Sequence, residues 1–262
     1  MSLPPPLTAL TDLDQELATA GFAVMDAASL CGLGHVPAGS YAAWNAHWND
    51  LPADNYLRDG GRYRRRRHAC FEIKLRRGPT PGTVVRVAHR AHWQPIEYNA
   101  LHGGIERWFE PMAHRMASDP AWAALLLALA DRAATMRGQS SSTWFVEAHP
   151  FRIDTTDGIG RPTPEGAHRD GVELVVVILV DRVGIKGGET RVFDTAGPQG
   201  MRFTLSEPWS ALLLDDERMI HESTPIQPIE PGRVGHRDTL VLTFRRGGFQ
   251  GPAATQTSAQ PD

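Results

Sequence analysis

Two histidines and one aspartate in the C-terminal half of the chain have the types and spacing of a metal site. The segment PEGAHRDGVELVVVILV, residues 164–180, brings His168 and Asp170 to the start of a run of branched apolar residues. Side chains two residues apart in a strand point to the same face, so we expect these two to lie together. His221, in LLLDDERMIHESTPI, is expected at the start of a later strand. Two imidazoles and one carboxylate form the facial triad that holds Fe(II) and leaves coordination positions open.

A second pair of residues has the chemistry to bind an acidic cosubstrate. Arg237 and Thr239 stand at the start of the last apolar segment, RDTLVLTF. The planar guanidinium of arginine binds a carboxylate with two hydrogen bonds and keeps its charge. Thr239 lies two residues further on, so in a strand it shares the face of Arg237 and could add a hydroxyl donor. Enzymes that combine the triad with 2-oxoglutarate need such a clamp for the far carboxylate of that dianion.

The elements that would position these residues change in character near residue 141. Helices are expected over residues 11–21, about 41–49 and 120–137, and a strand over 22–25. Beyond residue 141 the apolar segments read as strands separated by Gly, Pro and Asp turns: 143–153, 172–180, 189–194, 209–214, 219–226 and 238–244. Short strands that follow a run of helices predict an α+β fold with a sandwich or jelly-roll core and helices packed outside it.

The length of 262 residues is compatible with one large domain that spans residues 1–262. Residues 1–8 and about 250–262 are rich in proline or in small polar residues, and we expect them to be flexible. Residues 9–140 would form a helical and strand extension. Residues 141–249 would form the core that carries the metal site.

Composition and charge favour a soluble cytoplasmic protein. The hydrophobic fraction is 41%, the charged fraction 22% and the formal net charge −3, which gives no reason to expect nucleic acid or a membrane as partner. Cys31 and Cys70 form no disulfide framework, which favours a reducing compartment. The N-terminal segment lacks the basic and apolar regions of a secretory signal, and no apolar stretch approaches the length of a membrane span.

The basic run from Arg62 to Arg67 leaves an alternative open. Nucleic-acid binding would need interleaved aromatic residues and a broader basic face. Alternation in a strand would instead send half of these arginines to solvent and half toward acidic neighbours. We therefore keep nucleic-acid binding as the minor interpretation of this segment.

Several segments, in order along the chain, resemble one family. PTPEGAHRDG, GGETRVFD, LDDERMIHESTPI and RDTLVLTF are similar to the bacterial 2-oxoglutarate/Fe(II) dioxygenases that include L-isoleucine 4-hydroxylase and the biofilm-stress-and-motility (BsmA-like) proteins. YLRDGGRYRRRRHACFEI and QPIEYNALHGGIERWFEPM also resemble this family, so the similarity covers most of the chain. The combination of motifs is specific, although no single motif is.

The resemblance implies a double-stranded β-helix (jelly-roll, cupin-like) core with flanking N-terminal and central helices. It implies that His168, Asp170 and His221 bind Fe(II) and that Arg237 holds 2-oxoglutarate. With O2 as the other cosubstrate, such an enzyme converts 2-oxoglutarate to succinate and CO2 and hydroxylates an aliphatic C–H bond. Characterised relatives act on free aliphatic amino acids, so a free L-amino acid is the expected substrate. The carboxylate at Asp170 argues against the related halogenases, in which chloride takes that position.

An amino-acid substrate needs an acceptor for its ammonium group and a cation for its carboxylate. Glu165, just before the metal pair, and Arg152, at the end of VEAHPFRI, are candidates, although either could be a structural ion-pair partner. A homodimer is an open alternative to a monomer.

Simpler interpretations stand beside these. His168 and Asp170 could form a surface pair and His221 could be a core histidine, while His236 competes as a ligand but adjoins Arg237 and should point away. The alternative function is a non-catalytic, cupin-like module that binds a metal or small ligand in stress or biofilm regulation. Arg237 separates the two functions, because a module without turnover needs no carboxylate clamp.

Overall fold

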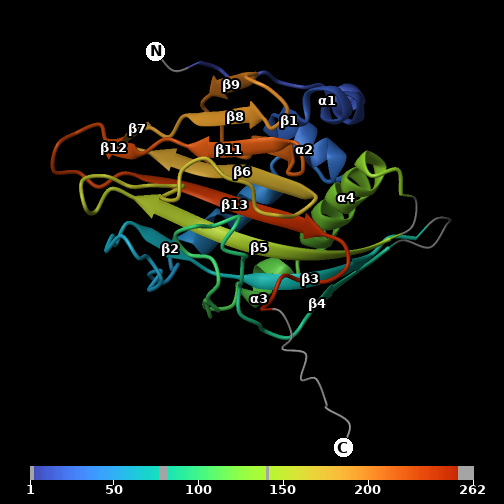
Figure 1. Ribbon diagram of the computed structural model, residues 1–262, viewed down its shortest axis with the longest axis horizontal. Coiled ribbons are helices and arrows are strands. Elements are labelled where there is room, and N and C mark those ends of the chain that lie inside the picture. Colours follow the sequence, from blue (N-terminus) through green and yellow to red (C-terminus); the bar gives the residue numbers. More distant parts are fainter. Residues whose placement is uncertain (1–2, 77–81, 140–141, 253–262) are drawn as a thin grey trace, which may run out of the picture.

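The computed structural model describes residues 3–76, 82–139 and 142–252, which form two facing β-sheets with helices packed on the outside (Figure 1). The large antiparallel sheet has the strand order β1-β10-β6-β13-β5-β3-β4, and β2 also pairs with β5. A three-stranded sheet, β11-β8-β9, and a two-stranded sheet, β12-β7, make up the smaller layer. This is the jelly-roll β-sandwich core that the sequence predicted.

The strands are β1 Phe22–Met25, β2 Arg64–Arg66, β3 Ala69–Lys74, β4 Thr83–Arg86, β5 Thr143–Asp154, β6 Leu174–Val183, β7 Ile185–Gly187, β8 Thr190–Asp194, β9 Gly200–Phe203, β10 Ala211–Asp215, β11 Met219–Ser223, β12 Ile226–Pro228 and β13 His236–Arg245. The helices are α1 Leu13–Ala20, α2 Ala27–Leu33, α3 His114–Ala117 and α4 Pro120–Met136, with 3-10 turns η1 Leu10–Asp12 and η2 Ser40–Trp48. Helices α2 and α3 and the strands β3, β4, β7, β9 and β12 were missed from the sequence, and a strand at β2 was considered only as one interpretation of the basic run. The helix expected over 41–49 is the 3-10 turn η2.

Helix α4 covers the outer face of the large sheet. It begins at Pro120, directly after Asp119, whose carboxylate accepts the backbone N–H of Ala121 at 2.9 Å. The other oxygen of Asp119 accepts a hydrogen bond of 2.8 Å from the indole of Trp44, which ties η2 to this helix. Trp122 is fully buried between the helix and the sheet. The large core cluster therefore lies between the helices and the outer face of the sheet.

Alternation along β5 and β13 separates this core from the cavity on the other face of the sheet. On β5, Val146 and Ala148 join the core, whereas Glu147 and His149 line the cavity. On β13, Leu240, Leu242 and Phe244 join the core, and the residues between them, with Arg237, line the cavity. The antiparallel register pairs Thr239 with Phe151 and Thr243 with Glu147, so the inward side chains form rows across the sheet.

Residues from the first half of the chain take part in the large sheet. Within the proposed extension over residues 9–140, β1 pairs with β10, and β2 and β3 pair with β5. Residues 3–8 are held by backbone hydrogen bonds, including Thr8 N–H to Val24 (2.7 Å) and Thr204 N–H to Leu3 (3.0 Å). Residues 1–2 and 253–262 lie outside the described residues. Within the described part of the chain, no helix is both long and apolar enough to cross a bilayer.

Candidate metal centre and substrate cavity

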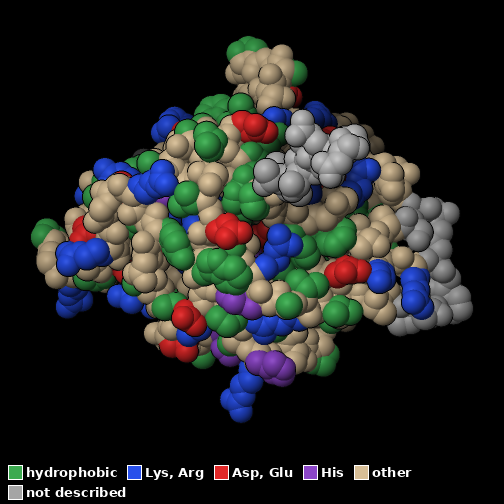
Figure 2. Space-filling view, turned by 60° about the horizontal axis from the view of Figure 1, so that its bottom comes forward, with side chains coloured by type: hydrophobic (Ala, Val, Ile, Leu, Met, Phe, Trp, Pro, Cys, Tyr) green, Lys and Arg blue, Asp and Glu red, His purple; other side chains and the backbone are tan. Residues whose placement is uncertain are grey.

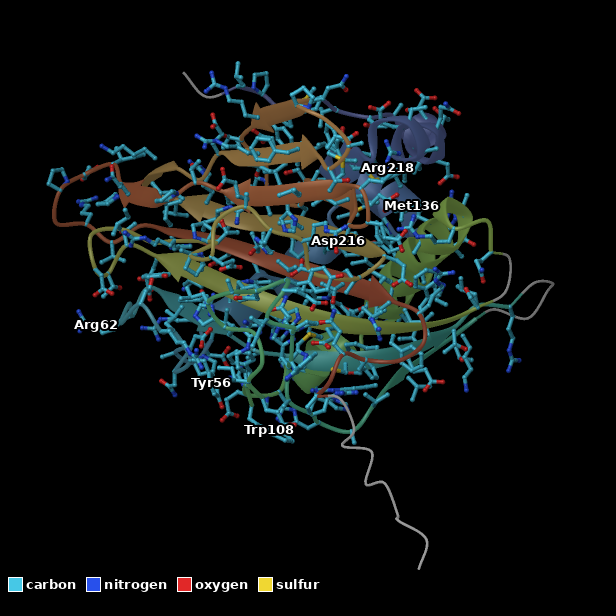
Figure 3. The ribbon with its side chains drawn as sticks, viewed as in Figure 1. Tyr56, Arg62, Trp108, Met136, Asp216 and Arg218 are labelled. Carbon is cyan, nitrogen blue, oxygen red and sulfur yellow. The ribbon has the colours of Figure 1, made fainter. Side chains whose placement is uncertain are left out.

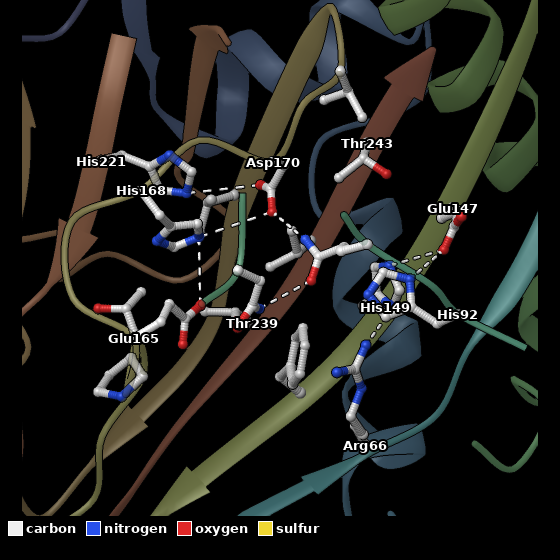
Figure 4. Close-up of a pocket in the computed structure, with 18 of the residues that line it drawn as sticks. Arg66, His92, Glu147, His149, Glu165, His168, Asp170, His221, Thr239 and Thr243 are labelled. Carbon is white, nitrogen blue, oxygen red and sulfur yellow. Dashed lines mark hydrogen bonds and ion pairs between the residues drawn. The ribbon is translucent and has the colours of Figure 1, made fainter. Parts of the chain in front are cut away.

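His168, Asp170 and His221 meet at one end of the cavity between the sheets (Figure 4). The Nε2 atom of His168 is 3.8 Å from Oδ1 of Asp170, and Nε2 of His221 is 3.9 Å from Oδ2 of the same carboxylate. One ligand atom from each residue lies within 4.8 Å of the others. These separations are too long for hydrogen bonds and suit a metal ion among the three atoms.

A turn, rather than a regular strand, positions the first two ligands. Strand β6 begins only at Leu174, so the expectation that His168 and Asp170 lie at the start of this strand is wrong in detail. His168 forms an isolated antiparallel bridge with His221, with hydrogen bonds of 3.0 and 2.9 Å. The carboxylate of Asp216 accepts the backbone N–H groups of residues 170, 171 and 172 at 2.8–3.1 Å and so fixes the turn. Asp216 lies in the interior of the molecule (Figure 3).

Hydrogen bonding orients one imidazole of the triad, and burial and neighbouring charges shift the pKa values of all three residues. Nδ1 of His168 lies 2.9 Å from the carbonyl of Gly166, which fixes the proton on Nδ1 and frees Nε2. Burial lowers the pKa of His168, but Asp170 and Glu165 outweigh this and raise it above the ordinary value. Burial, and then the charge of His168, lower the pKa of His221 well below its usual range. Burial is the main cause that raises the pKa of Asp170, against the opposing charge of His168 and the hydrogen bond from Gln94.

Arg237 and Thr239 lie on the cavity face of β13, as the sequence predicted. The guanidinium of Arg237 is buried, and its Nε and Nη2 atoms have no hydrogen-bond partner among the described residues. Burial, and then the charge of Arg182, lower the pKa of Arg237 to about 10, so the group remains charged at neutral pH. A buried cation with free donors facing a cavity fits the carboxylate of 2-oxoglutarate.

The two candidate substrate residues have different surroundings. Glu165 lines the cavity next to the triad, with Oε1 3.5 Å from Nε2 of His168 and Oε2 buried without a partner. Arg152 points to the opposite face of β5 and makes two hydrogen bonds, of 2.8 and 2.6 Å, to Asp238. Arg152 therefore lies outside the cavity. Alternate residues of β5 face opposite sides of the sheet, and Arg152 is on the side away from Glu147 and His149. His236, the competing ligand, contacts Asp181 and Asp238 instead.

Sequence reasoning missed the residues at the other end of the cavity. Glu147 accepts hydrogen bonds from His68 (2.9 Å) and His92 (2.6 Å), and His149 lies 3.7 Å from the same oxygen. Arg66 donates to Nδ1 of His149 at 2.6 Å. We call these five residues, all buried, the Glu147 network. Its sequence signal was the alternation Glu-x-His in VEAHPF, which matches that of His-x-Asp at the metal site.

Three further polar residues lie between the Glu147 network and the triad. Arg107 donates to Oε1 of Gln94 at 2.9 Å, and Gln94 donates to Oδ1 of Asp170 at 2.9 Å. Asn99 donates to the same Oε1 atom at 3.0 Å. No periodicity marks these residues, because they come from a segment without regular structure between β4 and α3. Their only sequence signal was that QPIEYNALHGGIERWFEPM, which contains all three, resembles the family.

The basic run divides between solvent, ion pairs and the cavity. Arg62 projects from the molecule beside Asp157 (Figure 3), and Arg65 lies 3.6 Å from Asp154. Arg64 and Arg66, on the opposite side of β2, are buried and line the cavity. On the face in Figure 2, basic side chains alternate with acidic and apolar ones rather than forming a continuous surface. The run thus contributes to the cavity, an outcome that the sequence analysis did not consider.

Comparison with known proteins identifies the class to which this fold and cavity belong. The family model described as 2OG-Fe dioxygenase matches residues 45–243, and the chain belongs to this family. The protein is a 2-oxoglutarate-dependent dioxygenase whose family implies Fe(II), 2-oxoglutarate and O2 as cofactor and cosubstrates. The triad and the buried, unpartnered Arg237 fit these groups.

Solved structures extend this comparison. A bsmA homolog from Methylobium petroleophilum PM1 is 53% identical, with a TM-score of 0.88 over 95% of this chain and 98% of that one. IDO from Bacillus thuringiensis shares the fold at 14% identity, with a TM-score of 0.69 over 95% of this chain and 100% of that one. The Fe(II)/(alpha)ketoglutarate-dependent dioxygenase TqaL shares it at 18% identity, with a TM-score of 0.63 over 90% and 87% of the two chains. No curated protein matches the chain.

Proposed function

We propose that the enzyme hydroxylates an aliphatic C–H bond of a free L-amino acid or a similar small molecule, with succinate and CO2 as coproducts. His168, Asp170 and His221 would hold the iron, which supplies the oxidising chemistry when 2-oxoglutarate and O2 bind. Arg237 would hold the distant carboxylate of 2-oxoglutarate, and Thr239 would add a hydroxyl donor beside it. The chain's own contribution is to bind, orient and exclude water from the reactants.

The observation that carries this proposal is the separation of charge along the cavity. Near the triad, Glu165 offers a buried carboxylate oxygen that no described residue hydrogen-bonds. Further along, Arg66 and Arg107 are buried, and the Nε atom of each lacks a partner within residues 3–76, 82–139 and 142–252. The charges of Glu165 and Glu147 favour the charged form of Arg107, whereas burial is the main cause that lowers its pKa to about 10. An amino acid carries one ammonium and one carboxylate, and these groups supply a counterpart for each.

The charged side chains of the cavity leave an excess of positive charge near the Glu147 network and negative charge near the triad. Arg64 is paired with Asp54 at 2.7 Å, and one negative charge on Glu147 faces the two positive charges of Arg66 and Arg107. That end therefore keeps an excess of positive charge, and Glu165 provides negative charge near the triad. A zwitterion satisfies both, and a buried charge without a partner is costly. Aliphatic and aromatic side chains line the rest of the cavity, among them Val177, Val241 and Phe151.

The first test is anaerobic reconstitution with Fe(II), followed by a 2-oxoglutarate titration read in the visible spectrum. We expect a weak charge-transfer band, because the keto acid would chelate the metal on its open face. Arg237→Ala should weaken 2-oxoglutarate binding at least tenfold while iron binding persists, since a charge-assisted pair contributes about 1.5–3 kcal/mol. A screen of amino acids for succinate release would then identify the substrate.

The alternative is a cupin-like module that binds a metal or small ligand without turnover. The buried Arg237 favours the enzyme, because a module without a dicarboxylate cosubstrate has no use for an unpaired cation beside its metal. If iron binds but no band forms with 2-oxoglutarate, the amino-acid hydroxylase is excluded and the module becomes the better account.

A further inference from the structure

Gln94 contacts the metal-site carboxylate directly, and its amide has only one orientation compatible with its neighbours. Oε1 receives hydrogen bonds from Asn99 (3.0 Å) and Arg107 (2.9 Å), whose nitrogen groups can only donate. The amide nitrogen must therefore face Asp170, 2.9 Å from Oδ1. Gln94 and its two anchoring residues are buried and line the cavity beside the triad.

We propose that Gln94 is a positioning residue of the iron site that keeps Asp170 a ligand through one oxygen. This inference rests on the proposed assignment of the triad. A carboxylate can bind a metal through one oxygen or through both. Two-oxygen binding would occupy a position that 2-oxoglutarate and O2 need on the open face. The N–H of Gln94 donates a hydrogen bond to Oδ1 of Asp170. Oδ2, which faces His221, is then the oxygen that would bind the metal.

The surroundings hold both ends of this contact in place. Asp216 fixes the backbone of Asp170, and Gln250 donates from its side chain to the carbonyls of Asp170 (3.1 Å) and Gly171 (2.9 Å). Arg107 and Asn99 lock the amide of Gln94 in turn. Residues that orient metal ligands in this way typically change metal affinity or activity by about 10- to 100-fold when they are replaced.

A purely structural role for Gln94 is the competing explanation, because its Oε1 also satisfies Arg107 and Asn99. Two substitutions separate the roles. Gln94→Glu keeps an acceptor for both donors but replaces the N–H toward Asp170 with an oxygen. Gln94→Met removes the acceptor and the donor together. Gln15→Met is the matched control, since Gln15 is exposed on helix α1, away from the cavity.

The experiment is an anaerobic Fe(II) titration of each variant, followed by 2-oxoglutarate and a visible spectrum, with thermal unfolding as a check on folding. We expect Gln94→Glu and Gln94→Met to weaken Fe(II) binding about 10- to 100-fold and to shift or abolish the charge-transfer band, while Gln15→Met matches the wild type. If Gln94→Met does not fold, Gln94→Glu still decides, because it keeps the structural acceptor. Unchanged or tighter Fe(II) binding in Gln94→Glu, with an unchanged band, overturns the inference. A wild-type protein that gives no band would instead refute the proposed function.

Discussion

The two histidine clusters of this cavity contain the same kinds of side chains but differ in how those side chains meet. In the triad, nitrogen and carboxylate atoms stand 3.8–3.9 Å apart without bonding one another. In the Glu147 network, two imidazole nitrogens approach Glu147 to 2.6 and 2.9 Å, which are hydrogen-bond distances. The nitrogen and carboxylate atoms of the triad therefore keep lone pairs available for a cation. In the Glu147 network, the carboxylate already accepts hydrogen bonds from the imidazoles.

The two clusters also differ in the charged groups beside them, because the guanidinium of Arg66 lies within the Glu147 network. Arg66 donates to Nδ1 of His149, so the proton of that ring stands on Nε2, and His149 cannot offer that nitrogen to a metal. Arg66 also lies 3.8 Å from the ring centre of Phe109 and 4.1 Å from that of Phe151, so the guanidinium is held where a metal ion would be repelled. Two clusters with similar composition thus have different chemistry, and hydrogen-bond direction distinguishes them better than ligand type.

The largest expected difference is in metal content. Asp170→Ala should abolish iron binding and succinate formation, because it removes the one carboxylate of the triad. His92→Gln removes an imidazole of the Glu147 network and should leave one iron per chain. Metal analysis after anaerobic reconstitution with Fe(II) measures both variants side by side. Two metal ions per wild-type chain, falling to one in His92→Gln, would show that both clusters bind metal, contrary to the expectation.

The next largest effect concerns stability. Glu147→Gln keeps the shape of the side chain but removes the negative charge that Arg66 and the histidines face. Neutralising a buried carboxylate leaves the donors that face it without a charged acceptor and typically costs about 1–3 kcal/mol. We expect a loss of this size in the free energy of unfolding, measured by urea denaturation, with iron stoichiometry unchanged in the protein that remains folded.

A suitable control for this substitution is Glu222→Gln, on β11 of the smaller sheet. Glu222 pairs with Arg191 at 3.2 Å in a partly exposed position, where an ion pair contributes about 0–1 kcal/mol. Equal losses in the two variants would show that Glu147 is no more than an ordinary ion-pair partner.

The sequence predicted the strands of the core because alternation is a local pattern, whereas the three residues of the triad were recognised from their types and their spacing. Alternation in residues 143–153 and 238–244 marked the strands, and strand neighbours bring Arg237 and Thr239 to one face whatever the rest of the chain does. The position of Arg152 followed from the same rule: an even residue on β5 faces away from its odd neighbours Glu147 and His149. The rule was available from the sequence, but the direction of the cavity was not.

The residues between the triad and the Glu147 network could not be predicted in this way. Gln94, Asn99 and Arg107 lie on a segment without periodicity, and only tertiary packing brings them to Asp170. The arginines of β2 had the correct alternation, but which half turned inward depended on the pairing of β2 with β5. Asp216 was visible in the sequence only as one of two adjacent aspartates, and its role as acceptor for a turn depends on the return of the chain after β10.

The smallest of the expected effects is a dependence of stability on pH that belongs to the Glu147 network. Burial is the main cause that lowers the pKa of His92 from 6.5 to about 3 in the folded protein, against the opposing charge of Glu147. Between these two values the unfolded chain binds a proton that the folded chain does not, so stability falls as the pH falls below about 6.5. A histidine of this kind contributes a loss of about 1.4 kcal/mol between pH 7.5 and 5.5.

The pKa values of His68 and His149 are lowered in the same direction, also mainly by burial, so their contributions add to that of His92. Urea denaturation of the iron-free protein at pH 7.5 and 5.5 measures the total loss. His92→Gln removes one titrating group, so its loss over this range should be smaller than that of the wild type by about 1.4 kcal/mol. An equal loss in both proteins would mean that His92 already binds its proton in the folded state. Glu147 would then be paired with an imidazolium, and the second cluster would be an ion pair rather than a network of neutral rings around one carboxylate.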